Sequence, residues 1–183
     1  MKKSIAWILT TIMMLALLTG CGSKSAKSDT EYVKKNGKLI VGITDYEPMD
    51  YKDENGEWTG FDAEFARMFA KELGVDCEFF VIADWGQKFF ELDSKNIDAI
   101  WNGMTITDEV TLNTNCSKPY VINAQVVVMK ADAVGNYADT DSLKDLTFAV
   151  ESGSAGEDAV KGLGISDYVA VQDQTKAVME VSA

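Results

Sequence analysis

The chain has 183 residues and a formal net charge of −12, with 17 basic and 29 acidic side chains and no histidine. Nucleic-acid binding is excluded because no basic surface is available to neutralise phosphates. The absence of histidine excludes the usual general base, the Ser–His and Cys–His nucleophile pairs and most zinc sites. We therefore expect no catalytic residues, no metal site and no cofactor.

The first 20 residues predict a signal peptide. Lys2 and Lys3 precede an apolar run from residue 5 to 18, which is shorter than the roughly 20 residues that a membrane-spanning helix needs. The run ends in Leu-Thr-Gly-Cys, which resembles the lipobox of bacterial lipoproteins. This resemblance implies acylation of Cys21 and a lipid anchor on the extracytoplasmic face of the cell membrane. Residues 21–31 are small and polar and predict a flexible tether.

The next part of the chain predicts alternating strands and helices. Apolar runs and helical periodicity indicate strands at 38–44, 76–82, 97–101 and 125–130, the last long and buried, and helices at 61–73 and 85–95. In the first of these helices one apolar stripe contains Phe61, Phe65, Met68, Phe69 and Leu73. Gly74 is placed to end that helix, and Asn55-Gly56 predicts a hairpin turn before it.

The remaining residues continue the same alternation. They predict a short helix at 141–145, a strand at 147–151, a helix at 155–163, a strand at 168–171 and a helix from Asp173 onward. Such a rhythm is typical of an α/β fold with a mainly parallel sheet, in which ligands bind at the carboxyl ends of the strands. Cys77 and Cys116 are expected to be buried thiols, and a disulfide between them is the alternative.

Four segments in this order carry a resemblance to a known family. They are GFDAEFARMFAKELG at 60–74, IDAIWNGMTITDE at 97–109, SKPY at 117–120 and SGSAGEDAV at 152–160. They resemble the amino-acid-binding family of bacterial extracellular solute-binding proteins. The resemblance implies a two-lobe, periplasmic-binding-protein-like (type II) α/β fold with lobes at 32–129 and 130–183. It also implies a monomeric substrate-binding component of an ABC importer, which delivers an amino acid or similar small polar solute to a permease.

The resemblance also indicates ligand-binding residues in the first lobe. Asp45 and Tyr46 follow the first strand and Trp85 begins a helix, where the family has aromatic walls; the alternative is that the two aromatic residues only pack in the core. Asn102, Gly103 and Thr105 follow the third strand. There the family offers backbone groups and a hydroxyl to the amino and carboxylate groups of its ligand, and Gly103 permits close approach.

Ser152 and Ser154 are the expected ligand-binding residues of the second lobe. They precede a helix whose free N–H groups suit an anion. Ser154 with Glu157 also fits a capping box, which is a structural role, and the two roles are compatible.

Two features depart from the family pattern. Val110 stands where family members place an arginine that holds the ligand carboxylate, and the single arginine of the chain, Arg67, is expected to be a solvated surface charge. Either Thr105 and helix N–H groups hold the carboxylate, or the ligand is not a standard α-amino acid. The last helix pattern also stops at Ala183 without a cap, which predicts an incomplete second lobe, an exposed sheet edge and weak binding.

Two other functions remain as alternatives. A ligand-sensing domain of a receptor can share this fold. A periplasmic enzyme similar to cyclohexadienyl dehydratase would need a carboxylate in the cleft, for which Asp45 and Glu47 are the candidates.

Overall fold

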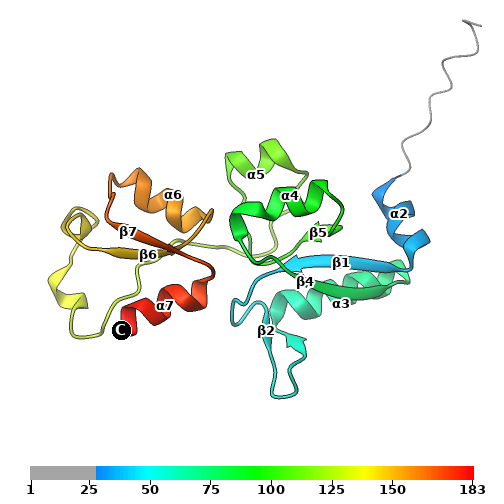
Figure 1. Cartoon of the computed structure of the whole chain (residues 1–183), viewed down its shortest axis with the longest axis horizontal. Helices are drawn as coiled ribbons and strands as arrows, with labels where there is room; N and C mark the ends of the chain where they lie inside the picture. Colours follow the sequence, from blue (N-terminus) through cyan, green and yellow to red (C-terminus); the bar gives the residue numbers. More distant parts are fainter. Residues whose placement is uncertain (1–27) are drawn as a thin grey trace, which may run out of the picture. The chain divides into compact units, whose positions relative to one another are not determined.

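The first sheet consists of three parallel strands in the order β4-β1-β5 (Figure 1). The computed structural model describes residues 28–183. β1 (Lys38–Ile43) pairs along its whole length with β4 (Asp76–Val81) and over a shorter stretch with β5 (Ala99–Ile100). All three strands were predicted, and β5 is shorter than the expected 97–101.

Small residues bring helix α3 (Phe61–Leu73) close to this sheet. Ala66 and Ala70 lie on one side of the helix and pack against Val41 and Ile43 of β1, which are fully buried. The helix ends as predicted at Gly74, whose left-handed backbone (φ +76°) allows its N–H to reach the last carbonyl groups of α3. The alanines therefore set the contact surface of this helix, and Gly74 sets its end.

The apolar stripe of α3 is not its buried face. The exposed fractions of Phe65 and Met68 are 37% and 65%, because the alanines occupy the side that faces the sheet. The ring of Phe65 instead contacts Trp101 at 5.0 Å and Tyr120 at 5.5 Å between centroids. The stripe thus forms an exposed aromatic surface over the edge of the first sheet.

A hairpin precedes α3, as Asn55-Gly56 predicted. β2 (Tyr51–Lys52) and β3 (Trp58–Thr59) are antiparallel. Asp53 Oδ1 accepts hydrogen bonds from the N–H groups of Asn55 and Glu57, which holds the turn. Gly60 then connects the hairpin to α3 with φ +114°.

The second sheet consists of two parallel strands, β6 (Phe148–Glu151) and β7 (Tyr168–Val171). Two helices, α6 (Ala155–Gly162) and α7 (Gln174–Ser182), contact strand β6. Val150, Val160 and Ile165 form its core. These four elements were predicted within a few residues. The short helix expected at 141–145 is a 3₁₀ turn, η3 (Asp141–Leu143), and a second such turn is η2 (Val134–Asn136).

Several shorter helical elements occur in the part of the sequence between β4 and β6. The helix predicted at 85–95 consists of a 3₁₀ turn, η1 (Trp85–Gln87), followed by α4 (Lys88–Asp93). A further helix, α5 (Asp108–Asn113), was not predicted. Thr107 is the N-cap residue of α5, since its Oγ1 accepts a hydrogen bond from Val110 N–H.

The prediction of a long buried strand at 125–130 is wrong. These residues have no regular structure, and Val126 is 77% exposed. An apolar run becomes a strand only when a neighbouring strand accepts and donates its backbone hydrogen bonds. Among residues 28–183 no strand pairs with this segment.

The N-terminal predictions fall mostly outside the described residues. The predicted signal peptide and Cys21 lie in residues 1–27, and Asp29 to Glu31 of the predicted tether belong to helix α2 (Asp29–Asn36). Within the described part of the chain, no helix has the length and apolar character needed to span a bilayer. Cys77 is half-buried and Cys116 exposed, and both are free thiols, so the expectation of burial is wrong for Cys116.

Candidate functional site

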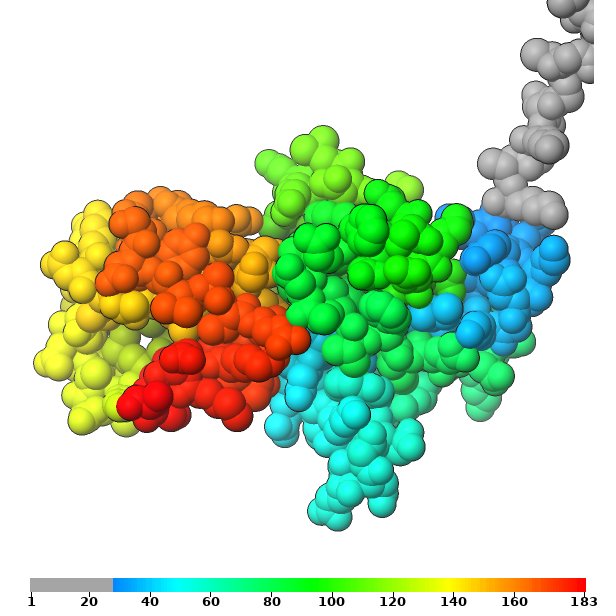
Figure 2. All heavy atoms as spheres, in the orientation of Figure 1, coloured from blue at the N-terminus to red at the C-terminus, as the bar shows by residue number. Residues whose placement is uncertain are grey.

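A cavity of about 550 Å³ lies between the two sheets. In Figure 2 the orange part of the chain lies against the green part, and the hydrogen bond from Lys88 Nζ to Gly153 O, 3.0 Å long, shows that the two regions touch. The volume is within the usual range for small-molecule sites. Six predicted residues line the cavity, namely Tyr46, Trp85, Asn102, Gly103, Thr105 and Ser154.

Tyr46 and Gly103 form one wall of the cavity through a close contact. Gly103 has φ +59°, and a Cβ there would lie 3.1 Å from Cε1 of the Tyr46 ring. Its N–H donates to Asp62 Oδ2. Gly103 therefore brings the backbone close to an aromatic ring, as its expected close approach requires, and its N–H is bonded to Asp62.

Two buried carboxyl groups lie behind this wall. Asp62 is fully buried and accepts hydrogen bonds from Gly103 N–H and Tyr120 O–H. Asp50 is fully buried as well, and neither of its oxygens has a hydrogen-bond partner among the described residues. Burial, with a contribution from the charge of Asp62, raises the pKa of Asp50 to about 8.

We predict that Asp50→Asn removes much of the dependence of stability on pH. The folded-state pKa of about 8 exceeds the ordinary value of 3.8, so folding holds a proton on Asp50. The stability that this proton contributes is complete below about pH 4 and is lost as the pH rises to about 8, with a slope of up to about 1.4 kcal/mol per pH unit.

Urea unfolding at pH 5, 6.5 and 8 measures this effect. The asparagine variant should show a flatter profile and be more stable than the wild type at pH 8. Asp76→Asn, at an exposed position on β4, is the matched control and should retain the wild-type slope. Equal slopes in both variants would show that Asp50 does not carry the effect.

Asn102 and Thr105 shape the floor of the cavity. Asn102 is buried, its Oδ1 accepts from Thr44 N–H at 2.8 Å and its Nδ2 donates to Thr44 Oγ1 at 2.7 Å. Both functions of this amide thus join the ends of β1 and β5. Thr105 Oγ1 accepts from Asn123 Nδ2 at 2.7 Å, and its hydroxyl hydrogen is left to donate.

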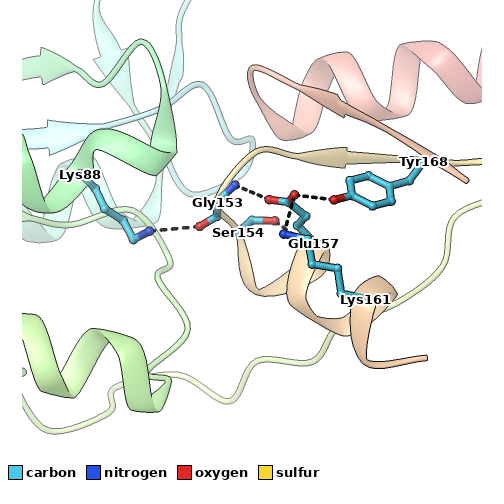
Figure 3. Close-up of polar contacts among 6 residues, drawn as sticks. All are labelled: Lys88, Gly153, Ser154, Glu157, Lys161 and Tyr168. Carbon is cyan, nitrogen blue, oxygen red and sulfur yellow. Dashed lines mark hydrogen bonds and ion pairs between the residues drawn. The ribbon is translucent and has the colours of Figure 1, made fainter. Parts of the chain in front are cut away.

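Lys88, the first residue of α4, donates a hydrogen bond from its Nζ to Gly153 O in the loop after β6, as Figure 3 shows. Its exposed fraction is 3%, and its Nζ lies 5.3 Å from the ring centroid of Trp85 and 4.7 Å from that of Phe89. Burial lowers the pKa of Lys88, and the acidic groups around it, Glu109 first, oppose this change. Lys88 is a buried cation in the cavity wall with backbone carbonyl partners.

The loop after β6 leads into α6, and Ser154 is the N-cap residue of that helix. Ser154 Oγ accepts from Glu157 N–H at 3.2 Å, which is one half of the predicted capping box. Glu157 Oε2 accepts from Gly153 N–H at 2.7 Å, one residue before the expected partner (Figure 3). Ala155 and Gly156 line the cavity in the first turn of α6, where backbone N–H groups have no acceptor within the helix.

Two predicted residues lie outside the cavity lining. Asp45 is exposed beyond the end of β1, and Ser152 donates its backbone N–H to Val171 O at 2.9 Å. Arg67 also lies elsewhere: it pairs with Glu64 and donates to the carbonyl of Trp58, so it is more engaged than a solvated charge. Val110, at the position of the family's arginine, is buried and lines the cavity.

Several charged residues of the cavity were not predicted as ligand-binding residues. Its lining contains four carboxylates, Glu47, Glu109, Glu151 and Asp158, and among the described lining residues Lys88 is the one basic side chain. The sequence contained one signal for Glu151, since it is a single acidic residue that closes the apolar run of β6. Such a residue at the carboxyl end of a parallel strand points to a ligand site.

The model of the family "Bacterial extracellular solute-binding proteins, family 3" matches residues 39–178. The chain belongs to this family. The L-cystine-binding protein TcyJ of Escherichia coli K12 is 32% identical over 167 residues, which is 87% of this chain and 62% of TcyJ. The arginine-binding extracellular protein ArtP of Bacillus subtilis is 35% identical over 89% of this chain and 61% of ArtP. The chain thus spans about three fifths of the length of these two relatives.

A solved structure shows the same fold. The ancestral amino-acid-binding protein AncCDT-1, described as a precursor of cyclohexadienyl dehydratase, superposes with a TM-score of 0.80 at 33% identity, covering 85% of this chain and 70% of that chain. The expected type II periplasmic-binding-protein-like α/β fold is therefore confirmed for the part that matches.

Proposed function

We propose that this protein is the substrate-binding component of an ABC importer and captures an amino acid or similar small polar solute. The observation that carries the proposal is the cavity of about 550 Å³ between the two sheets, lined by aromatic, hydroxyl and charged groups. The similarity to TcyJ, an L-cystine-binding protein, and to ArtP, an arginine-binding protein, supports it. On this proposal the lobes are residues 32–129 and 130–183, and a permease is the partner.

The cavity offers groups for both poles of an amino acid. For the carboxylate, the N–H groups of Ala155 and Gly156 at the start of α6 are joined by the Thr105 hydroxyl and by Lys88. The rings of Tyr46 and Trp85 can cover the apolar part of the solute. Several weaker donors would thus take the role of the family's arginine, whose position is occupied by Val110 in this chain.

We further propose that Cys21 carries a lipid anchor and that the protein acts as a monomer on the extracytoplasmic side of the membrane. The Leu-Thr-Gly-Cys motif after a short apolar run supports the anchor. Mass spectrometry of the protein from a membrane fraction tests it. A mature N-terminus at a residue other than Cys21, without a lipid, would contradict it.

Thermal-shift measurements on the purified full chain with the common amino acids test the binding function. A ligand of the native state should raise the melting temperature in proportion to the logarithm of its concentration. The ligand should be recovered unchanged after long incubation, because a binding protein does not transform it. Consumption of the ligand would favour the dehydratase alternative, and no shift with any amino acid would contradict the proposal.

A further inference from the structure

Glu151 is a buried carboxyl group with one oxygen left unpaired. It ends β6, its exposed fraction is 4%, and it lines the cavity. Its Oε2 accepts a hydrogen bond from Gln174 Nε2 at 3.1 Å. Its Oε1 is buried and has no hydrogen-bond partner among the described residues. An unpaired buried acceptor of this kind is costly, and it is satisfied when a donor enters the cavity.

Lys88, the basic residue of the cavity lining, does not donate a hydrogen bond to Glu151 Oε1. The hydrogen bonds of Lys88 Nζ go to the carbonyl oxygens of Gly153, at 3.0 Å, and Trp85, at 3.5 Å. Lys88 forms no ion pair with Glu151 within 4 Å. Oε1 of Glu151 therefore has no hydrogen-bond donor among the described residues.

The charge of the cavity lining indicates which donor fits. Four carboxylates and one lysine give the lining a formal charge of 1 − 4 = −3 when all five are ionised. This charge favours cations over anions; Glu47, Glu109 and Asp158 are exposed and act through solvent, whereas Glu151 is buried. A solute with a net positive charge therefore gains more from this cavity than a neutral zwitterion of the same shape.

We propose that Glu151 is the residue that determines specificity, and that its Oε1 binds a cationic nitrogen of a positively charged amino acid or similar small organic cation. This inference rests on the proposed function. It adds the class of solute and the side chain that selects it. Gln174 holds the carboxyl through Oε2 and leaves Oε1 as the oxygen that the solute would use.

Protonation of Glu151 gives a second, independent signature. Burial raises its pKa from 4.5 to about 7; Gln174 and, more weakly, Lys88 lower it, and Asp173 raises it. Lys88 is itself surrounded by Glu109 and Asp158. Because a cation binds the ionised carboxylate, affinity should be constant above about pH 7.5 and fall by up to about tenfold per pH unit below about pH 6.5.

Titration calorimetry with L-lysine and L-norleucine tests the inference on the wild-type full chain. Norleucine keeps the length of the lysine side chain and lacks its ammonium group. We expect lysine to bind at least about thirtyfold more tightly, since a buried charge pair is worth on the order of 2 kcal/mol or more. Equal affinities for the two would overturn the inference and leave the proposed function intact.

The variant Glu151→Gln keeps the shape of the side chain and removes its charge. It should lose most of the preference for lysine, bind norleucine about as the wild type does, and lose the decrease in affinity below pH 6.5. Glu180→Gln, an exposed position on α7, is the control with the same change in net charge and should behave like the wild type. An unchanged lysine preference and pH profile in Glu151→Gln would refute the role of Glu151. If the wild type binds no amino acid of any charge, the proposed function itself fails.

Discussion

The variant Gly60→Ala should be less stable than the wild type by about 3 kcal/mol. Gly60 has φ +114° and ψ 174°, a backbone region that is almost restricted to glycine. A Cβ at this position would lie 2.3 Å from Met49 O and 2.8 Å from Pro48 O. These two carbonyl groups accept the N–H groups of Asp62 and Phe61, so they have no freedom to move away without losing the start of α3.

Chemical denaturation followed by circular dichroism measures this loss. Gly56→Ala is the matched control, because Gly56 also has a positive φ of +80° but no atom within 4 Å of an added Cβ. The control should lose about 1 kcal/mol from backbone strain alone. Similar losses in the two variants would show that the contact with Met49 is not important.

The variant Gly153→Ala should bind its solute at least about tenfold more weakly. An added Cβ would lie 2.6 Å from Gly86 Cα and 2.9 Å from Gly86 N, which are backbone atoms on the first sheet's side of the cavity. The loop after β6 would have to move away from η1, and the hydrogen bond from Lys88 to Gly153 O would lengthen. Moving this loop costs binding affinity, because close packing and exact placement of the groups around a cavity are both required for binding.

Calorimetry with the amino acid found by thermal shift tests this expectation. Gly164→Ala is the control: its φ of +75° is similar to the +68° of Gly153, but nothing lies within 4 Å of an added Cβ. Both variants should show a comparable loss of stability from the backbone, and Gly153→Ala alone should lose affinity. Wild-type affinity in a folded Gly153→Ala protein would contradict the structural role of this contact.

The elements that the sequence predicted are those with local signals. β1 and α3 follow from periodicity, and Gly74 ends α3 because glycine takes the left-handed conformation easily. The prediction of a strand at 125–130 was wrong, since the apolar composition of this segment does not indicate whether a neighbouring strand is available to pair with it. The stripe of Phe61, Phe65 and Phe69 was found, but which face of a helix is buried depends on the alanines that the sheet accepts.

The candidate site was predictable where a residue lies next to a motif. Tyr46, Trp85, Asn102 and Ser154 were found in this way, and each lines the cavity. Lys88 was missed because its importance comes from burial and from Gly153, which is far away in the sequence. Glu151 had a signal in its position at the end of an apolar run, but its burial and its unpaired oxygen had none. Unpaired atoms and buried charges are visible only when the packing is known.

Glu157 has a further consequence for how the cavity meets a solute. Its carboxylate accepts hydrogen bonds from Gly153 N–H and Tyr168 O–H and pairs with Lys161, so one side chain joins the cavity loop to β7 and to α6. The loop that presents the N–H groups of α6 is thereby held in its binding geometry before any solute arrives. Preorganisation of this kind reduces the entropy lost on association. Part of the affinity for the solute is therefore set at Tyr168, the first residue of β7, which lies outside the cavity lining.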